Sequence, residues 1–243
     1  MVHNLSMPIR FIIKIIYLTL ITKMKKMRME ISLMRMIKME RTILAGEGAR
    51  EKASKLNFEG NKYFNEGSLT EALKCYIKAL NIFFEAETLI NIGDTLQLKG
   101  EWEKAFNAYI YALQQSAKQG DIINKLADIL QRADLPLLAT FLYKQAIRLN
   151  PDACNAWYDL GCALLKIGEK VESIKIFQKI LVAFPKSEEA IKSAQILFLL
   201  AVEEKQSCLA NEAFAFLKNE ESSHPELQLI IKQFKEELAK ISK

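Results

Sequence analysis

The apolar residues of this chain recur at helical spacing, and small and aromatic residues repeat along it at intervals of 33 or 34 positions. A first small residue stands at Gly60, Gly93, Ala127 and Gly161, and a second follows each by twelve positions, at Ala72, Ala105, Ala139 and Ser173. An aromatic ring comes four positions later in each copy, at Tyr76, Tyr109, Tyr143 and Phe177. A repeat of this length predicts tandem helical pairs, each too small to bury its apolar face alone, that stack on their neighbours.

The fourth copy, residues 154–187, shows how one pair is built. Its first helix is predicted from residues at i, i+3, i+4 and i+7, namely Trp157, Leu160, Gly161 and Leu164. Its second helix is predicted from residues at i, i+4 and i+7, namely Ser173, Phe177 and Ile180. These are the packing faces, and the small residues on them allow the two helices to approach closely.

A turn residue separates the two predicted helices of each copy. In three copies it is a glycine, at Gly67, Gly100 and Gly168. Glycine adopts positive φ readily, which suits a helix end. In the third copy Asp134 takes this place, and we expect it to cap the helix that begins with Pro136.

These residues resemble the tetratricopeptide repeat, whose signature is Trp-x-x-Leu-Gly-x-x-Tyr followed by Ala, Phe or Tyr, Ala and Pro at set offsets. One copy matches it at Trp157, Leu160, Gly161, Phe177 and Pro185. The resemblance implies an all-α fold, a right-handed α-solenoid of tandem helical hairpins. The predicted repeats are residues 53–85, 86–119, 120–153 and 154–187, with a degenerate fifth repeat at 188–221 and a capping helix at 225–241 that Pro225 opens.

Residues 1–41 are a basic, methionine-rich segment that differs from the repeats. They contain all eight methionines of the chain and nine Lys or Arg against two Glu, a charge of +7. Because the whole chain carries +5, residues 42–243 carry −2. The basic balance therefore belongs to this segment, and we expect no nucleic-acid partner for the repeats.

Three interpretations of residues 1–41 remain open. The apolar run at 11–22, broken by Lys14, fits a signal peptide or a membrane span poorly, because it is short and lacks a small-residue cleavage site. Residues 23–41 fit a basic amphipathic helix on a membrane surface. Alternatively, translation starts later, at Met29 or Met39, and the upstream residues are a disordered extension or a misassigned start. We expect a cytoplasmic protein, with peripheral attachment to a membrane as the alternative.

The chain offers little chemistry for catalysis. Its two histidines are His3 and His224, far apart in the sequence and without metal-ligand partners at a useful spacing. The four cysteines, none in a Cys-x-x-Cys pair, are Cys75, Cys154, Cys162 and Cys208. They are interpreted as reduced thiols within helices. Gly-rich phosphate loops and Gly-x-Ser-x-Gly are absent. We therefore expect no enzymatic activity, no metal and no cofactor.

The resemblance implies that the first helix of each pair lines a concave groove. The residues expected to contact a partner there are Asn57, Asn61, Asn91, Asn124, Lys125 and Tyr158. An asparagine side chain offers one acceptor and two donors, so it can pair with the backbone of an extended peptide whatever that peptide's side chains are. The other interpretation is that these amides are merely solvated.

Some members of the family hold the C-terminal carboxylate of heat-shock chaperones with two lysines, an arginine and two asparagines. Asn61 and Asn91 resemble the two asparagines. The cations do not match, because Asn57 and Asp121 stand where the lysines should be and Lys125 replaces the arginine. We therefore do not expect this clamp to form.

The sequence thus predicts a protein-interaction adaptor that binds a peptide or helix of a partner protein in the groove. The alternative is a structural or assembly subunit of a larger, membrane-associated complex that uses the convex face or the repeat edges.

Overall fold

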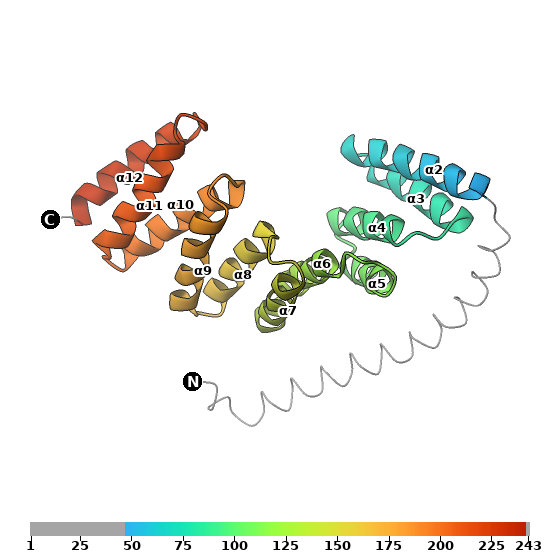
Figure 1. Ribbon diagram of the computed structural model, residues 1–243, viewed down its shortest axis with the longest axis horizontal. Helices are drawn as coiled ribbons and strands as arrows, with labels where there is room; N and C mark the ends of the chain where they lie inside the picture. Colours follow the sequence, from blue (N-terminus) through green and yellow to red (C-terminus); the bar gives the residue numbers. More distant parts are fainter. Residues whose placement is uncertain (1–46, 242–243) are drawn as a thin grey trace, which may run out of the picture. The chain divides into compact units, whose positions relative to one another are not determined.

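The computed structural model describes residues 47–241, and these contain 11 helices and no strand (Figure 1). The predicted N-terminal segment, residues 1–41, lies outside the described residues. The helices, in chain order, are α2 (Glu47–Asn65), α3 (Leu69–Ile82), α4 (Ala86–Leu98), α5 (Trp102–Leu113), α6 (Gln119–Arg132), α7 (Pro136–Leu149), α8 (Cys154–Lys166), α9 (Lys170–Ala183), α10 (Glu188–Glu203), α11 (Ser207–Glu220) and α12 (Leu227–Ile241). No helix among the described residues is long and apolar enough to cross a membrane.

The chain divides into two units, Met1–Thr88 and Leu89–Lys243. The described part of the first unit is the α2/α3 hairpin, whose core includes Ala53, Tyr76 and Ala79. The second unit runs from α4 to α12 and repeats the same hairpin in α4/α5, α6/α7, α8/α9 and α10/α11. The fold is an α-solenoid of helical hairpins.

Each of the first four hairpins is closed by the ring of its second helix, which packs against the small residue of its first helix. A Cβ atom placed on Gly60 would lie 2.5 Å from Cε1 of Tyr76, and one on Gly161 would lie 2.6 Å from Cε1 of Phe177. The ring of Tyr109 lies equally close to Gly93. Because the ring fills the space of a side chain, the helix axes come close together at this point, which explains the period found in the sequence.

The turns between paired helices share one backbone geometry. Gly67, Gly100 and Gly168 have φ between 76° and 81°, in the left-handed region. The backbone N–H of the residue directly after the glycine donates to the carbonyl oxygen five residues earlier. In the fourth hairpin Glu169 donates to Leu164 in this way, at 2.9 Å. This is the glycine-terminated helix end that satisfies otherwise unpaired carbonyl groups.

Two residues other than glycine hold this left-handed turn position, and the prediction made for one of them, Asp134, is wrong. Asp134 has φ 57° and Lys205 has φ 53°. Asp134 is therefore not the N-cap of α7, because Leu135 is, and no side chain caps that helix. Asp134 instead substitutes for the turn glycine, with Leu135 donating to Leu130 at 2.9 Å. Aspartate tolerates the left-handed conformation better than most residues do.

The last hairpin lacks a ring at the repeat position of its second helix, where Asn211 is exposed. Phe198 of α10 is fully buried, and its ring centroid lies 6.3 Å from that of Phe214 of α11 and 3.9 Å from that of Phe234 of α12, on which it stacks. Pro225 does not open α12 as predicted, since the helix begins at Leu227 after a turn. The capping helix thus adds an aromatic stack to the core of the fifth hairpin.

The shared turn geometry predicts opposite effects of two substitutions in the second unit. Lys205→Gly should raise the free energy of unfolding by about 1 kcal/mol, because glycine adopts positive φ without a steric penalty. Gly168→Ala should lower it by about 1 kcal/mol, although an alanine Cβ there would meet nothing within 4 Å. Urea unfolding of both variants checks this, and equal midpoints for the two would contradict it.

Candidate functional site

The candidate site is a row of polar side chains on the first helices of the second unit, here called the first-helix face. It consists of Asn91 and Asp94 on α4, Asn124, Lys125 and Asp128 on α6, and Tyr158, Asp159 and Cys162 on α8. These residues alternate with the small and apolar residues that pack against the second helices. On each first helix, the helical spacing that directs the small and apolar residues toward the core therefore directs these polar residues to a different face of the helix.

Two aspartates of this row accept hydrogen bonds from the hydroxyls of the packed tyrosine rings. The Tyr109 hydroxyl donates to Asp94 at 2.5 Å, and the Tyr143 hydroxyl donates to Asp128 at 2.7 Å. Each aspartate directly follows the small residue against which the ring packs, as does Asn61, which accepts from Tyr76 at 2.7 Å in the first unit. A buried hydroxyl needs a partner, and these side chains supply it.

The fourth hairpin is the exception that supports this explanation. Its ring is Phe177, which has no hydroxyl, and the residue after Gly161 is Cys162. No acceptor for the ring is needed there, and Cys162 instead contacts the hydroxyl of Tyr158 on the same helix. The sequence reasoning missed this pairing, although the signal exists as an acceptor fifteen positions before each tyrosine.

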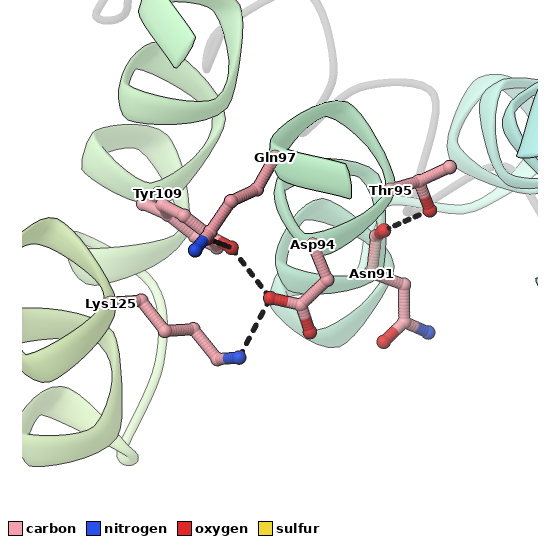
Figure 2. Close-up of polar contacts among 6 residues, drawn as sticks. All are labelled: Asn91, Asp94, Thr95, Gln97, Tyr109 and Lys125. Carbon is pink, nitrogen blue, oxygen red and sulfur yellow. Dashed lines mark hydrogen bonds and ion pairs between the residues drawn. The ribbon is translucent and has the colours of Figure 1, made fainter. Parts of the chain in front are cut away.

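Between α4 and α6 the row is electrically balanced. Lys125 of α6 forms an ion pair with Asp94 of α4 at 2.7 Å, and its ammonium lies 5.9 Å from the centre of the Tyr109 ring. Figure 2 shows Asp94 between the Tyr109 hydroxyl and the Lys125 ammonium, with Gln97 beside the same hydroxyl at 2.9 Å. A carboxylate that accepts from a phenol and an ammonium together is well satisfied.

Between α6 and α8 the row is not balanced. Lys125 and Asp94 are 31 residues apart, and the residue 31 positions after Asp128 is Asp159. A second carboxylate therefore stands at the repeat position that a lysine holds in the preceding pair of helices. Neutral groups donate to both, the Tyr143 hydroxyl to Asp128 and the Asn124 amide to Asp159 at 3.3 Å.

Burial and like charge raise the pKa of both carboxyl groups. Burial and the Asp128 carboxylate are the two largest causes that raise the pKa of Asp159, to about 6. Glu189 raises it further, while Asn124 and Lys192 oppose the shift. Burial also raises the pKa of Asp128, against the lowering effects of the Tyr143 hydroxyl, Lys125 and Arg132. The protein therefore holds two carboxyl groups that resist ionisation on one face.

The side-chain oxygen of Asn124, beside Asp159, also lacks a hydrogen-bond donor. Asn124 is only 5 % exposed, and its Oδ1 atom has no hydrogen-bond partner, while its amide nitrogen donates to Asp159. A buried carbonyl oxygen without a donor destabilises the folded state by about 1–3 kcal/mol. Two carboxyl groups and one amide oxygen in this part of the face thus lack sufficient donors.

The predicted contact residues are divided between the two units. Asn57 is half-buried and Asn61 is exposed, both on α2 of the first unit. On the first-helix face of the second unit, Asn91, Lys125 and Tyr158 are half-buried, and Asn124 is buried. The Tyr158 ring packs obliquely on Phe177 with centroids 6.0 Å apart. Partner binding by these six residues stays a prediction.

The comparison with known proteins identifies one repeat of the chain. A sequence profile described as the tetratricopeptide repeat matches residues 142–175, from the middle of α7 to the start of α9. The chain contains a tetratricopeptide repeat. No curated protein matches the chain.

Solved structures of tetratricopeptide repeat proteins share this fold. MamA 41-end from Desulfovibrio magneticus RS-1 has a TM-score of 0.60 and 21 % identity, with 74 % of this chain and 98 % of that chain covered. A tetratricopeptide repeat protein from Parabacteroides merdae has a TM-score of 0.60 and 19 % identity, with coverage of 79 % and 74 %. YrrB, described as a tetratricopeptide repeat protein with an unusual peptide-binding site, has a TM-score of 0.53 and 22 % identity, with coverage of 80 % and 97 %. At these identities the likeness shows the fold alone.

The raised pKa of Asp159 predicts how stability changes with pH. Because its pKa rises from 3.8 to about 6 on folding, the folded state binds more protons in that window, so stability falls as pH increases through it. Asp159→Asn removes this dependence and should stabilise the protein by about 1–3 kcal/mol near neutral pH, with no gain below about pH 4. Urea unfolding at a series of pH values measures the difference, and a gain that is independent of pH would contradict the assignment.

Proposed function

We propose that this tetratricopeptide repeat protein is an adaptor that holds an extended segment of a partner protein along the first-helix face. The observation that carries the proposal is the row of half-buried polar side chains along this face, together with one unsatisfied oxygen. Asn91, Lys125 and Tyr158 are half-buried there, and the oxygen of Asn124 lacks a donor. Extended concave surfaces of stacked repeats are the surfaces that repeat proteins use for binding.

The chemistry of the face suits a peptide backbone. Asparagine side chains can donate to a carbonyl and accept from an amide of the same peptide unit, which fixes an extended strand without selecting its side chains. Asn57 and Asn61 of the first unit carry the same side-chain chemistry on α2. YrrB, whose fold is similar, carries a peptide-binding site according to its description, and this supports a peptide as the kind of ligand.

The charges on the face argue against a terminal carboxylate as the ligand. The cation that would bind it, Lys125, is already paired with Asp94. Asp128 and Asp159 would repel a second anion at short range. We therefore propose an internal segment of the partner as the ligand.

A second candidate is assembly through the opposite side of the hairpins, here called the second-helix face and formed by Leu137, Phe141, Val171 and Val182. Leu137 and Phe141 lie one turn apart on α7 and are 54 % and 60 % exposed. Val171 and Val182 on α9 are also exposed. Exposed apolar side chains on adjacent helices are typical of contact surfaces between proteins, which gives this candidate its support.

Two pairs of substitutions distinguish the candidates. The full chain is used as bait in lysate of the source organism, beside Asn91→Ala/Tyr158→Ala on the first-helix face and Leu137→Ala/Phe141→Ala on the second-helix face. We expect the first pair to lose a partner that the second pair keeps, because the first removes hydrogen-bonding and ring contacts to it. Mass spectrometry identifies the bound proteins, and thermal unfolding confirms that both variants are folded.

The reverse result would favour the second candidate. A partner that is retained by Asn91→Ala/Tyr158→Ala and lost by Leu137→Ala/Phe141→Ala would contradict binding along the first-helix face and assign the contact to α7.

A further inference from the structure

The repeat itself shows which charge is missing from the first-helix face. The comparison is between two pairs of first helices, α4 with α6 and α6 with α8. In each pair, the residue directly after the small residue of the earlier helix faces a residue of the later helix. That second residue stands two positions before the small residue of its own helix. In the first of these pairs the two residues are Asp94 and Lys125, joined by an ion pair at 2.7 Å. In the second they are Asp128 and Asp159, both acidic. One cation completes the first position, whereas no cation of residues 47–241 forms an ion pair at the second.

Among the ion pairs of residues 47–241, none includes Asp128 or Asp159. Lys125 and Arg132 lower the pKa of Asp128, and Lys192 lowers that of Asp159. Lys125 is nevertheless paired with Asp94 at 2.7 Å, and Lys192 with Glu188 at 2.9 Å. Arg132 of α6 lies over the Trp102 ring, 4.9 Å from its centre. The donors that reach the two carboxylates are a phenol and an amide, both neutral.

Asn124 is an independent sign that a donor is absent. Its side chain is more than nine-tenths buried and is directed at Asp159, to which its nitrogen donates. Its Oδ1 atom, on the same amide group, accepts nothing. Asn124 also lies one helical turn before Asp128 on α6, so the three side chains share one part of the face.

We propose that Asp128, Asp159 and Asn124 form a subsite for the guanidinium group of an arginine in the bound segment. The inference rests on the proposed function, since it names one side chain of the ligand held on the first-helix face. A guanidinium has five donors in a planar fork and can bridge two carboxylates and an amide oxygen at once. A lysine ammonium would fit less completely, because its three donors are clustered at one point.

The subsite should act as a selectivity device. An arginine is attracted by two carboxylates, whereas an acidic side chain at the same place is repelled by both. The segment recognised is therefore basic or neutral at this position, and anionic surfaces such as nucleic acids or acidic membranes are disfavoured.

Binding at this subsite should strengthen as pH rises. Asp159 has a raised pKa, and a bound cation favours its ionised form. The titratable groups that act on Asp159 are Asp128 of α6, Tyr143 of α7, Tyr158 and Cys162 of α8, and Glu189 and Lys192 of α10. Of these, Tyr143, Tyr158 and Cys162 remain neutral at physiological pH because burial raises their pKa values. The acidic members of the set therefore control the change.

A selection experiment tests the subsite without knowledge of the natural partner. A random linear peptide library displayed on phage is selected on the full chain and on Asp128→Asn/Asp159→Asn. We expect arginine to be enriched at one fixed position with the natural chain and not with the variant. The variant should fold, since it relieves repulsion between buried carboxyl groups.

A second variant controls for net charge. Glu172→Gln/Glu212→Gln removes the same charge from the second helices α9 and α11, where both residues are exposed. It should keep the arginine preference. For one selected peptide, fluorescence anisotropy should show about tenfold weaker binding to Asp128→Asn/Asp159→Asn, and weaker binding to the natural chain at about pH 5 than at about pH 7.5.

The outcomes separate this inference from the proposed function. Selected peptides that bind the natural chain without enrichment of arginine, or whose arginine preference survives in Asp128→Asn/Asp159→Asn, would overturn the subsite and leave peptide binding intact. Equal loss of the preference in Glu172→Gln/Glu212→Gln would reduce it to general charge attraction and also overturn the subsite. A library that yields no binders would contradict the proposed function itself, and the subsite with it.

Discussion

The packing of one aromatic ring onto one small residue is the constraint on which the hairpins depend. At Gly60, Gly93 and Gly161 the ring lies where a Cβ atom would have to be, so the two helices are held at a separation that only a small residue permits. When the ring is a tyrosine, its hydroxyl reaches the first helix of the same hairpin and requires a hydrogen-bond acceptor there. The acceptor is the side chain of the residue directly after the small residue, and in the second unit this residue belongs to the first-helix face. Packing in the core thus places carboxyl groups on the surface proposed for binding.

This link explains why the face combines satisfied and unsatisfied charges. Asp94 accepts a hydrogen bond from the Tyr109 hydroxyl and also forms an ion pair with Lys125. Asp128 accepts a hydrogen bond from the Tyr143 hydroxyl in the same way, but it faces Asp159 instead of a lysine. The repulsion between these carboxyl groups lowers the stability of the free protein. Retention of such a group is expected where a site is built for a ligand and not for stability, because the ligand supplies the opposite charge.

The sequence predicted the fold better than the site, for physical reasons. The helices and turns follow from spacings that recur in four copies, so each copy supports the others. Asp134 was misjudged because aspartate suits both a cap and a left-handed turn, and only the backbone distinguishes them. The stack of Phe198 on Phe234 joins helices distant in sequence, which no local spacing encodes. Asn124 is only 5 % exposed and donates to Asp159 of α8, a contact between helices that no local spacing encodes.

If a partner binds along the first helices while the second helices support them, binding should change hydrogen exchange in the first helices. Exchange of the full chain is measured with and without a captured partner, because bound segments slow the opening of the helices they contact. We expect slower exchange in α4, α6 and α8, with little change on the outer turns of α7 and α9. Slower exchange confined to α7 and α9 would contradict binding along the first helices.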